Sequence, residues 1–361
     1  GSYCTGTPSG IERYITQVAA RLAKRAEVTV LSTAPHVFDN LVQHVITLPK
    51  WTSGHRARVV WQLSLMQQHC RPRQDILFCP VPTVPPLSPI PVVSVVHDLT
   101  PLVLRRWHGS QQKGLFWLSL QSLRRAAAVL TVSEHTKKDL SRLRLLPPER
   151  IRVAPEGTAV IPEQCANEPA ASLRPFLLYV GCFYPHKNLL RLISAYKQAC
   201  LGSDVRLVIA GTDIPRWVLR TRQAIEHEQL DSRVVMLGAV TDPELAGLYR
   251  NCEAFVFPSL YEGFGLPVLE AMANGAPVIC SRVSSLPEIA GESAMYFNPH
   301  RTEEMVAAIR HVLSNSDVAD RMRRAGIARS RAYSWDRTAD IVYGTLSDVL
   351  DPHDLVPANN C

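Results

Sequence analysis

Short, mainly apolar runs alternate with longer mixed segments along most of the chain. Such runs occupy residues 92–96, 128–132, 176–180, 207–210 and 254–257. Runs of this length predict buried strands, and the amphipathic segments between them predict helices. The repeated order of strand and helix favours a parallel sheet, so the sequence predicts an α/β protein.

The clearest example of this pattern is the stretch from Ala254 to Cys280. Residues 254–257 form an apolar run, and residues 259–265 form a loop that contains glycine. Pro267 can begin a helix, because its missing N–H would have no partner in the first turn. Gly275 suits the end of that helix, and an apolar run follows it. The stretch therefore predicts a strand, a loop, a helix and a second strand.

Two carboxylates lie in this stretch, Glu262 in the loop and Glu270 near the start of the helix. A helix N-terminus offers N–H groups and partial positive charge to an anion. Gly263 and Gly265 allow a ligand to approach the backbone closely, because neither has a Cβ. These features together fit a polyhydroxylated, phosphate-bearing ligand, although either glutamate alone would more often be a helix-dipole partner or a solvated side chain.

The apolar run at 92–96 ends in His97 and Asp98. A residue at the carboxyl end of a parallel strand lies on the ligand side of an open α/β sheet. His97 is therefore a candidate site residue. The alternative is structural, with Asp98 capping the following turn.

The length of 361 residues suits two domains with a core each. The predicted domains are residues 1–172 and 173–332, and residues 333–361 are expected to form a terminal helix and tail. Hydrophobic residues make up 46% of the chain and charged residues 20%, as in soluble globular proteins. No apolar run approaches the ~20 residues of a membrane helix.

The nine cysteines are scattered and include no C-x-x-C pair. This favours a reducing compartment and argues against a disulfide framework or a zinc site. Charge is uneven, because residues 1–172 hold 20 Lys and Arg against 11 Asp and Glu, whereas the whole chain has a net charge of +7. The basic half, with its aromatic and arginine-rich segment 104–123, could face anionic lipid or a phosphate-bearing acceptor. The alternative is an ordinary arginine-rich surface.

Several motifs together resemble one family. EGFGLPVLE at 262–270 matches the E-x7-E signature of the retaining nucleotide-sugar glycosyltransferases of family 4, which have the GT-B fold. LLYVGCFYPHKNLLRLISAY at 177–196 resembles the strand, phosphate loop and helix of that family. VVHDLTP at 95–101 and VLTVSEHTKKDL at 129–140 resemble its first half. The resemblance covers nearly the whole chain and is greatest to mannosyltransferase-like members that build bacterial surface polysaccharides.

The resemblance implies two Rossmann-like domains with parallel sheets that face a central cleft, and a terminal helix in residues 333–361 that crosses back to the first domain. It implies transfer of a hexosyl group, with retention, from a nucleotide diphosphate sugar to a glycan or lipid-linked acceptor. GDP-mannose is the first donor it suggests. No metal or other cofactor and no nucleic acid is expected, and no D-x-D motif is present. A cytoplasmic location is expected, with peripheral contact at the inner face of the membrane through the basic half.

The resemblance also implies roles for individual residues. Lys187 would neutralise the leaving diphosphate, Glu262 would bind hydroxyls of the donor sugar, and His97 would contribute from the first domain. Glu270 would accept hydrogen bonds from the ribose diol. The remaining donor contacts would come from the segments that contain Gly10, Gly181, Val240, Gly263, Phe264, Gly265 and Leu266.

The chain departs from the family at two places. Cys182 stands where many relatives have an arginine, so the missing phosphate-binding cation would come from elsewhere, such as His186 or Arg13. A first strand expected ahead of the first helix is missing or reduced to residues 2–4. Ser284, Ser285 and Glu288 follow a predicted strand and could either cap the next helix or approach the ligand, and the capping role is favoured. A non-catalytic nucleotide-sugar-binding protein of this fold and a nucleotide-sugar epimerase remain as alternatives.

Overall fold

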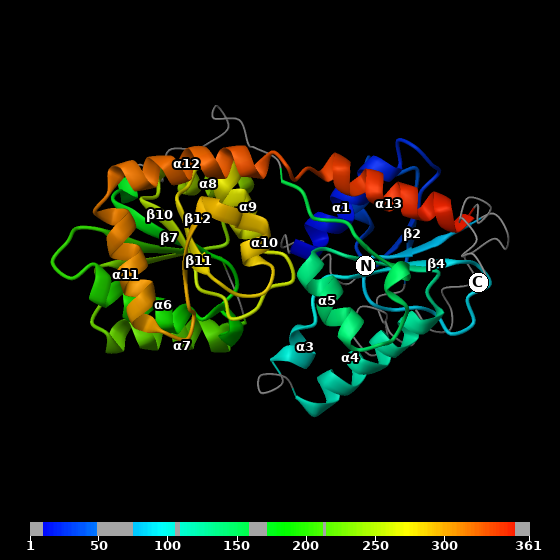
Figure 1. Ribbon diagram of the computed structural model, residues 1–361, viewed down its shortest axis with the longest axis horizontal. Helices are drawn as coiled ribbons and strands as arrows, with labels where there is room; N and C mark the ends of the chain where they lie inside the picture. The colour runs from blue at the N-terminus through cyan, green and yellow to red at the C-terminus, as the bar shows by residue number, and fades with distance from the viewer. Residues whose placement is uncertain (1–9, 49–74, 105–108, 159–171, 212–213, 351–361) are drawn as a thin grey trace, which may run out of the picture. The chain divides into compact units, whose positions relative to one another are not determined.

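The computed structural model describes residues 10–48, 75–104, 109–158, 172–211 and 214–350. The chain divides into two compact units (Figure 1). Unit 1 comprises Gly1–Gly157 with Ser334–Cys361, and unit 2 comprises Thr158–Tyr333. The division falls at residue 157, whereas the sequence suggested 172. The expected strand remnant at 2–4 lies outside the described residues, as do Arg105, Arg106 and Trp107.

Unit 1 contains two parallel sheets. The larger has the strand order β3-β4-β5-β6, and the smaller pairs β1 with β2. Their bounds are Thr29–Ser32 (β1), His44–Thr47 (β2), Leu77–Cys79 (β3), Val92–Val96 (β4), Ala128–Thr131 (β5) and Ile151–Val153 (β6). Every residue of β4 and β5 is buried. Burial on both faces explains why these strands have no alternation of apolar and polar residues.

The helices of unit 1 come from both ends of the chain. They are Gly10–Leu22 (α1), Thr100–Val103 (α3), Ser110–Ser122 (α4), Glu134–Arg142 (α5) and Trp335–Leu350 (α13). α13 lies alongside α1 (Figure 1). Ser133 caps α5 by accepting a hydrogen bond from the N–H of Thr136 at 3.0 Å.

Three arginine–aspartate pairs join α13 to the rest of unit 1. Arg21 of α1 contacts Asp336 at 2.7 Å, and Arg25 of α1 pairs with Asp340. Arg152 of β6 contacts Asp348 at 2.5 Å. The three aspartates are four and eight residues apart, so they lie along one side of the helix. These partly exposed pairs fix the direction of α13 rather than supplying much stability.

Unit 2 is built on a six-stranded parallel sheet with the order β12-β11-β10-β7-β8-β9. Its strands are Phe176–Val180 (β7), Arg206–Ala210 (β8), Val234–Gly238 (β9), Ala254–Phe257 (β10), Val278–Ser281 (β11) and Ala294–Phe297 (β12). The chain starts at β7 in the middle, runs to the β9 edge, returns to β10 and then runs to the β12 edge. The strand order therefore reverses between β7 and β10. This arrangement confirms the predicted α/β class with parallel sheets.

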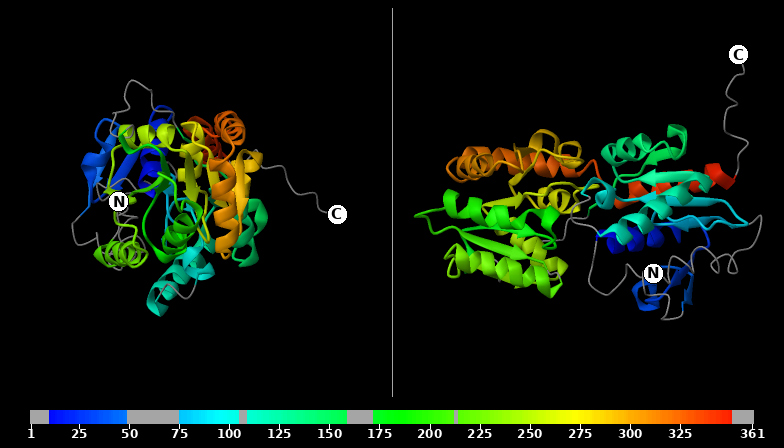
Figure 2. Two further views of the ribbon diagram at one scale, coloured as in Figure 1. Left: turned by 90° about the vertical axis from the view of Figure 1, so that its left-hand side faces the viewer. Right: turned by 90° about the horizontal axis from the view of Figure 1, so that it is seen from below.

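Helices cover both faces of this sheet (Figure 2). The helices of unit 2 are Leu189–Ala199 (α6), Pro215–His227 (α7), Asp242–Asn251 (α8), Leu266–Ala273 (α9), Leu286–Ala290 (α10), Thr302–Leu313 (α11) and Ser316–Ser330 (α12). One core holds side chains of α6, α7 and α11, and a second core holds those of α8, α9 and α10. Leu177 and Tyr179 enter the first core, and Phe176 and Leu178 enter the second. Alternate residues of β7 thus pack on opposite faces.

Glycines end three neighbouring strands of unit 2. Gly181, Gly211 and Gly238 follow or end β7, β8 and β9, with φ of 149°, 128° and 74°. The N–H of Gly211 donates to the carbonyl oxygen of Gly238 at 2.7 Å. A Cβ on Gly211 would lie 2.1 Å from the carbonyl oxygen of Gly181. Only glycine fits this close approach of the two turns.

We expect Gly211→Ala to destabilise unit 2 more than Gly202→Ala does. Gly202 also has a positive φ, of 77°, but a Cβ there meets open space. The control should therefore cost only the left-handed strain of about 1–2 kcal/mol. The clash at Gly211 should add about 1–3 kcal/mol. Urea unfolding followed by circular dichroism measures the free energy of unfolding of both variants. Equal decreases in the two variants would contradict the close approach of the turns.

Candidate functional site

Two loops of unit 2 meet where the strand order reverses. One follows β7 and spans residues 181–188, and the other follows β10 and spans residues 258–265. The N–H of Leu260 donates to the carbonyl oxygen of His186 at 2.7 Å. Ligands of open α/β sheets bind outside the carboxyl ends of the strands at such a reversal. The two loops predicted to hold the donor are therefore tied together at that position.

Asn188 strengthens this connection. Its side-chain amide donates to the carbonyl oxygens of Pro258 at 3.1 Å and Pro299 at 2.9 Å. Asn188 has a φ of 60°, a left-handed conformation that asparagine tolerates better than most residues. One amide thus connects the ends of the β7, β10 and β12 segments.

Lys187 and Glu262 form an ion pair across the two loops. Nζ of Lys187 lies 2.6 Å from Oε1 of Glu262, and the exposed fractions of the side chains are only 15% and 12%. Nζ also lies 5.4 Å from the ring centroid of Phe257. Such limited exposure leaves little solvent screening between the charges. The sequence nominated both residues for the site but did not predict that they would pair with each other.

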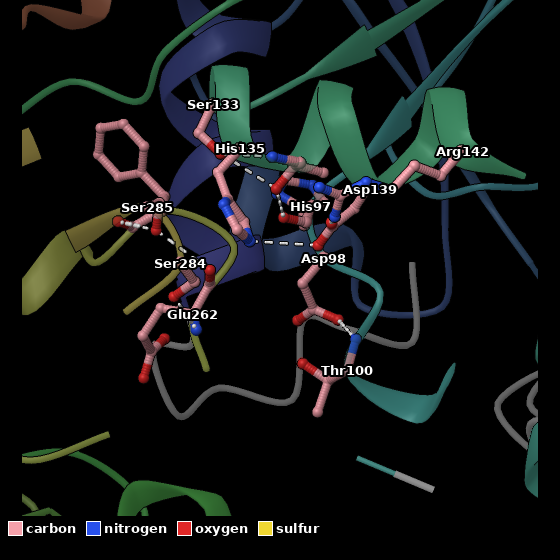
Figure 3. Close-up of polar contacts among 12 residues, drawn as sticks. His97, Asp98, Thr100, Ser133, His135, Asp139, Arg142, Glu262, Ser284 and Ser285 are labelled. Atoms are coloured by element: carbon pink, nitrogen blue, oxygen red, sulfur yellow. Dashed lines mark hydrogen bonds and ion pairs between the residues drawn. The ribbon is translucent and has the colours of Figure 1, made fainter. Parts of the chain in front are cut away.

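Ser284 and Ser285 hold the backbone of the Glu262 loop (Figure 3). Oγ of Ser284 accepts a hydrogen bond from the N–H of Glu262 at 2.9 Å. Oγ of Ser285 lies 2.6 Å from the carbonyl oxygen of Phe264 and 3.1 Å from that of Glu262. Neither serine side chain caps α10. The prediction of a capping role was wrong, because the two hydroxyls are used by the neighbouring loop.

The rest of the E-x7-E segment lies at the start of α9. Gly265 precedes this helix with a φ of 108°, and a Cβ there would lie 2.6 Å from Cδ2 of Leu286. No side chain caps the N-terminus of α9, which begins at Leu266 and has Pro267 in its first turn. Glu270 follows on the same helix and is buried. The positive end of the helix dipole suits an anionic ligand.

Phe264 joins the loop to the end of unit 2. Its ring packs edge-on against the ring of Tyr333, with centroids 5.9 Å apart. Phe264 and Gly263 are both buried. Their contribution to a ligand would therefore come from the backbone.

Cys182 follows the glycine turn at Gly181 and is half-buried. Its carbonyl oxygen accepts a hydrogen bond from the hydroxyl of Tyr179 at 2.6 Å. The imidazole of His186 stacks on the ring of Tyr184, with centroids 6.0 Å apart. His186 is in the same loop as Cys182, so it remains a candidate for the phosphate-binding role that an arginine at position 182 has in many relatives. Val240 lies beyond β9 and packs at the edge of the second core.

His97 lies at the carboxyl end of β4, in unit 1. Its Nδ1 is 3.3 Å from Oε1 of Glu156, and its Nε2 is 3.1 Å from the carbonyl oxygen of Pro80. The ring contacts Tyr14 edge-on at 4.8 Å. Burial, together with the negative charge of Glu156, raises the pKa of the Tyr14 hydroxyl far above its usual range. The sequence analysis did not single out Glu156, which lies three residues after the end of β6.

The remaining unit 1 candidates have simpler surroundings. Oδ1 of Asp98 accepts a hydrogen bond from the N–H of Thr100 at 2.8 Å, which is the structural role given as the alternative (Figure 3). Gly10 is the exposed first residue of α1, and a Cβ there would meet nothing within 4 Å. The roles of His97 and Gly10 toward a donor stay predictions.

Across the described parts of the chain, no group of three or more His, Cys, Asp or Glu side chains is placed to hold a metal ion. None of the described helices is long and apolar enough to span a bilayer.

Comparison with known proteins identifies the family. Residues 8–160 match the family described as "Glycosyltransferase Family 4", and residues 161–329 match "Glycosyl transferases group 1". The O-antigen chain mannosyltransferase B of Escherichia coli is 30% identical over 261 residues, which cover 68% of this chain and 67% of that protein. The serotype-specific mannosyltransferase WbdA of Escherichia coli is 30% identical over 286 residues, which cover 75% of this chain but only 35% of WbdA.

Solved structures show the same fold. The crystal structure of HepE from Anabaena in complex with UDP and glucose superposes with a TM-score of 0.75 at 17% identity, over 95% of this chain and 97% of HepE. At this identity the likeness concerns the fold alone. Taken with the two family matches and the similarity to the Escherichia coli enzyme, it establishes that the chain belongs to the family 4 and group 1 glycosyltransferases and has the GT-B fold.

Proposed function

We propose that this glycosyltransferase moves a hexosyl group, mannosyl in the first instance, from a nucleotide diphosphate sugar to a hydroxyl of a glycan or lipid-linked glycan. The anomeric configuration is retained. The observation that supports the site is the pairing of Lys187 with Glu262 where the strand order of unit 2 reverses. Several relatives are named mannosyltransferases, which supports mannose as the transferred sugar. The family membership does not favour a binding protein or an epimerase.

Lys187 binds the diphosphate. The bond that breaks joins the sugar to the diphosphate, so negative charge develops on the leaving group and positive charge on the sugar. An ammonium has three hydrogens and can donate to more than one acceptor, of which Glu262 is one. Lys187 can therefore hold Glu262 and a diphosphate oxygen together. Its cationic head is in place before the donor arrives.

Glu262 binds the donor sugar. Its Oε1 is held by Lys187, whereas its Oε2 has no hydrogen bond to any residue in the described parts of the chain. Oε2 is thus available to accept hydrogen bonds from sugar hydroxyls. The backbone of Phe264, Gly265 and Leu266 adds donors at the start of α9. Glu270 accepts hydrogen bonds from the ribose diol, and the segment that contains Val240 contacts the nucleobase.

His97 contributes to the donor from unit 1. Its two ring nitrogens both face acceptors, the carboxylate of Glu156 and the carbonyl of Pro80. These two contacts fix the orientation of the ring at the carboxyl end of β4, the side on which ligands of open α/β sheets bind.

We propose peripheral contact with anionic membrane through unit 1. Exposed apolar side chains on α3 and α4 include Val103, Trp117 and Leu118. Lys113 lies on α4, and the exposed Arg124 and Arg125 follow it. Apolar side chains beside basic ones suit an anionic lipid surface.

Nucleotide binding tests the site. We expect GDP to raise the thermal unfolding midpoint of the wild type, and Lys187→Ala and Glu270→Ala each to weaken GDP binding about 10-fold or more. Lys197→Ala is the matched control, because Lys197 pairs with Glu228 at 3.0 Å elsewhere in unit 2. UDP and ADP are measured beside GDP. Equal shifts in the control and the two site variants would contradict the assigned roles.

Metal removal tests the proposed charge stabilisation. If Lys187 and the backbone alone neutralise the diphosphate, excess EDTA should leave the rate of sugar transfer unchanged. Loss of transfer in EDTA, with recovery on adding Mg²⁺ or Mn²⁺, would show that a metal is needed.

Vesicle sedimentation tests the membrane contact. We expect binding to vesicles that contain phosphatidylglycerol, decreasing as salt rises. The double variant Trp117→Ser, Leu118→Ser should bind several-fold less, because it removes exposed apolar area. Leu201→Ser changes a more exposed leucine of unit 2 and serves as the control. Absence of wild-type binding at low salt would rule the contact out.

A further inference from the structure

Three consecutive residues, Ser284, Ser285 and Leu286, contact the Glu262 loop at successive points. They are called the 284–286 clamp below. Oγ of Ser284 accepts from the N–H of Glu262, and Oγ of Ser285 donates to the carbonyl oxygen of Phe264, with that of Glu262 nearby. Cδ2 of Leu286 occupies the space that a Cβ on Gly265 would need. The clamp therefore fixes both the loop and its entry into α9.

Ser284 adopts a conformation that usually belongs to glycine. Its φ is 49°, whereas the other residues with positive φ in this part of unit 2 are Gly265, Gly275 and Gly291. A serine in this region has a strain that glycine would not have. What serine supplies is the hydroxyl that accepts the N–H of Glu262 at 2.9 Å. Strain at a position that glycine could fill points to a use for the side chain.

The clamp and Lys187 together hold Glu262 at its backbone and at its carboxylate. Ser284 holds its N–H, Ser285 lies within reach of its carbonyl oxygen, and Lys187 holds Oε1 at 2.6 Å. Such fixing reduces the freedom that a loop side chain would lose on binding a ligand. It also sets the direction of the remaining oxygen, Oε2.

We propose that Ser284 is a positioning residue, which acts through Glu262 on the sugar portion of the donor and not on its nucleotide. The proposal rests on the function proposed above. Lys187 and Glu270, the residues assigned to the diphosphate and the ribose, make no hydrogen bond to Ser284 among those described. Loss of the Ser284 hydroxyl should therefore weaken the binding of a nucleotide sugar and leave the binding of the bare nucleotide unchanged.

The test compares GDP with GDP-mannose, or UDP with UDP-glucose if the wild type selects uridine nucleotides. Ser284→Gly tolerates the left-handed backbone, relieves its strain and removes the CH2OH side chain with its hydroxyl. We expect its Kd for GDP-mannose to rise about 5- to 10-fold, its Kd for GDP to stay at the wild-type value and its kcat to fall about 10-fold. The unfolding midpoint should not fall.

Two further variants complete the set. Ser284→Asn tolerates a positive φ and supplies an acceptor oxygen, so we expect it to recover part of the GDP-mannose affinity. Gln229→Gly is the matched control, because Gln229 is an exposed residue with a φ of 58° in the turn before β9. This variant relieves similar strain away from the carboxyl ends of the strands. Its Kd values for GDP and GDP-mannose should both equal those of the wild type.

The outcomes separate this proposal from the proposed function. If Glu262→Gln weakens GDP-mannose binding but Ser284→Gly does not, the positioning role is overturned and the function stands. Equal weakening of GDP and GDP-mannose by Ser284→Gly also overturns it, because a general disturbance of the site would act on both. If the wild type binds and transfers from none of the nucleotide sugars, the proposed function fails and the role of Ser284 fails with it.

Discussion

The ion pair between Lys187 and Glu262 is the interaction on which the site depends. It joins the loops after β7 and β10, the two strands between which the order of the sheet reverses. Removing two charges from water costs free energy of desolvation, and here each charge is compensated by its partner. A diphosphate beside Lys187 and a sugar beside Glu262 would extend this pair without dismantling it. Under the proposed function, this pair would place a cation and a carboxylate where the donor binds before the donor arrives.

The sheet provides the rigid frame for that pair. Its central strands β7, β10 and β11 are buried on both faces. The carboxyl ends of these strands present the glycine turn at Gly181, the loop of Glu262 and the 284–286 clamp along one edge. Parallel strands bring these loops together although Gly181 and Ser284 are 103 residues apart in sequence. Hydrogen bonds from Asn188 and Ser284 then fix the loops to each other. Precision in the site comes from these polar contacts, while the cores hold the strands.

The elements of the fold were predictable because apolar runs and helix signals are local. The strands at 92–96, 176–180 and 254–257 begin and end as the sequence indicates. The roles of Ser284 and Glu156 were not predictable, because each pairs with a residue far away in the chain. A serine before a helix has the same local pattern whether it caps that helix or binds a neighbouring loop. Hydroxyl and carboxylate partners are set by packing, which one sequence does not reveal.

The most direct test of the central claim is ¹H NMR of the reaction of GDP-α-mannose with a mannose-terminated glycan acceptor. Transfer with retention predicts a new α-anomeric signal that grows as GDP is released, only when the acceptor is present. A β-anomeric product would contradict retention. Conversion of the donor without acceptor would indicate an epimerase. An unchanged donor, for this and the UDP- and ADP-sugars, would contradict transfer itself.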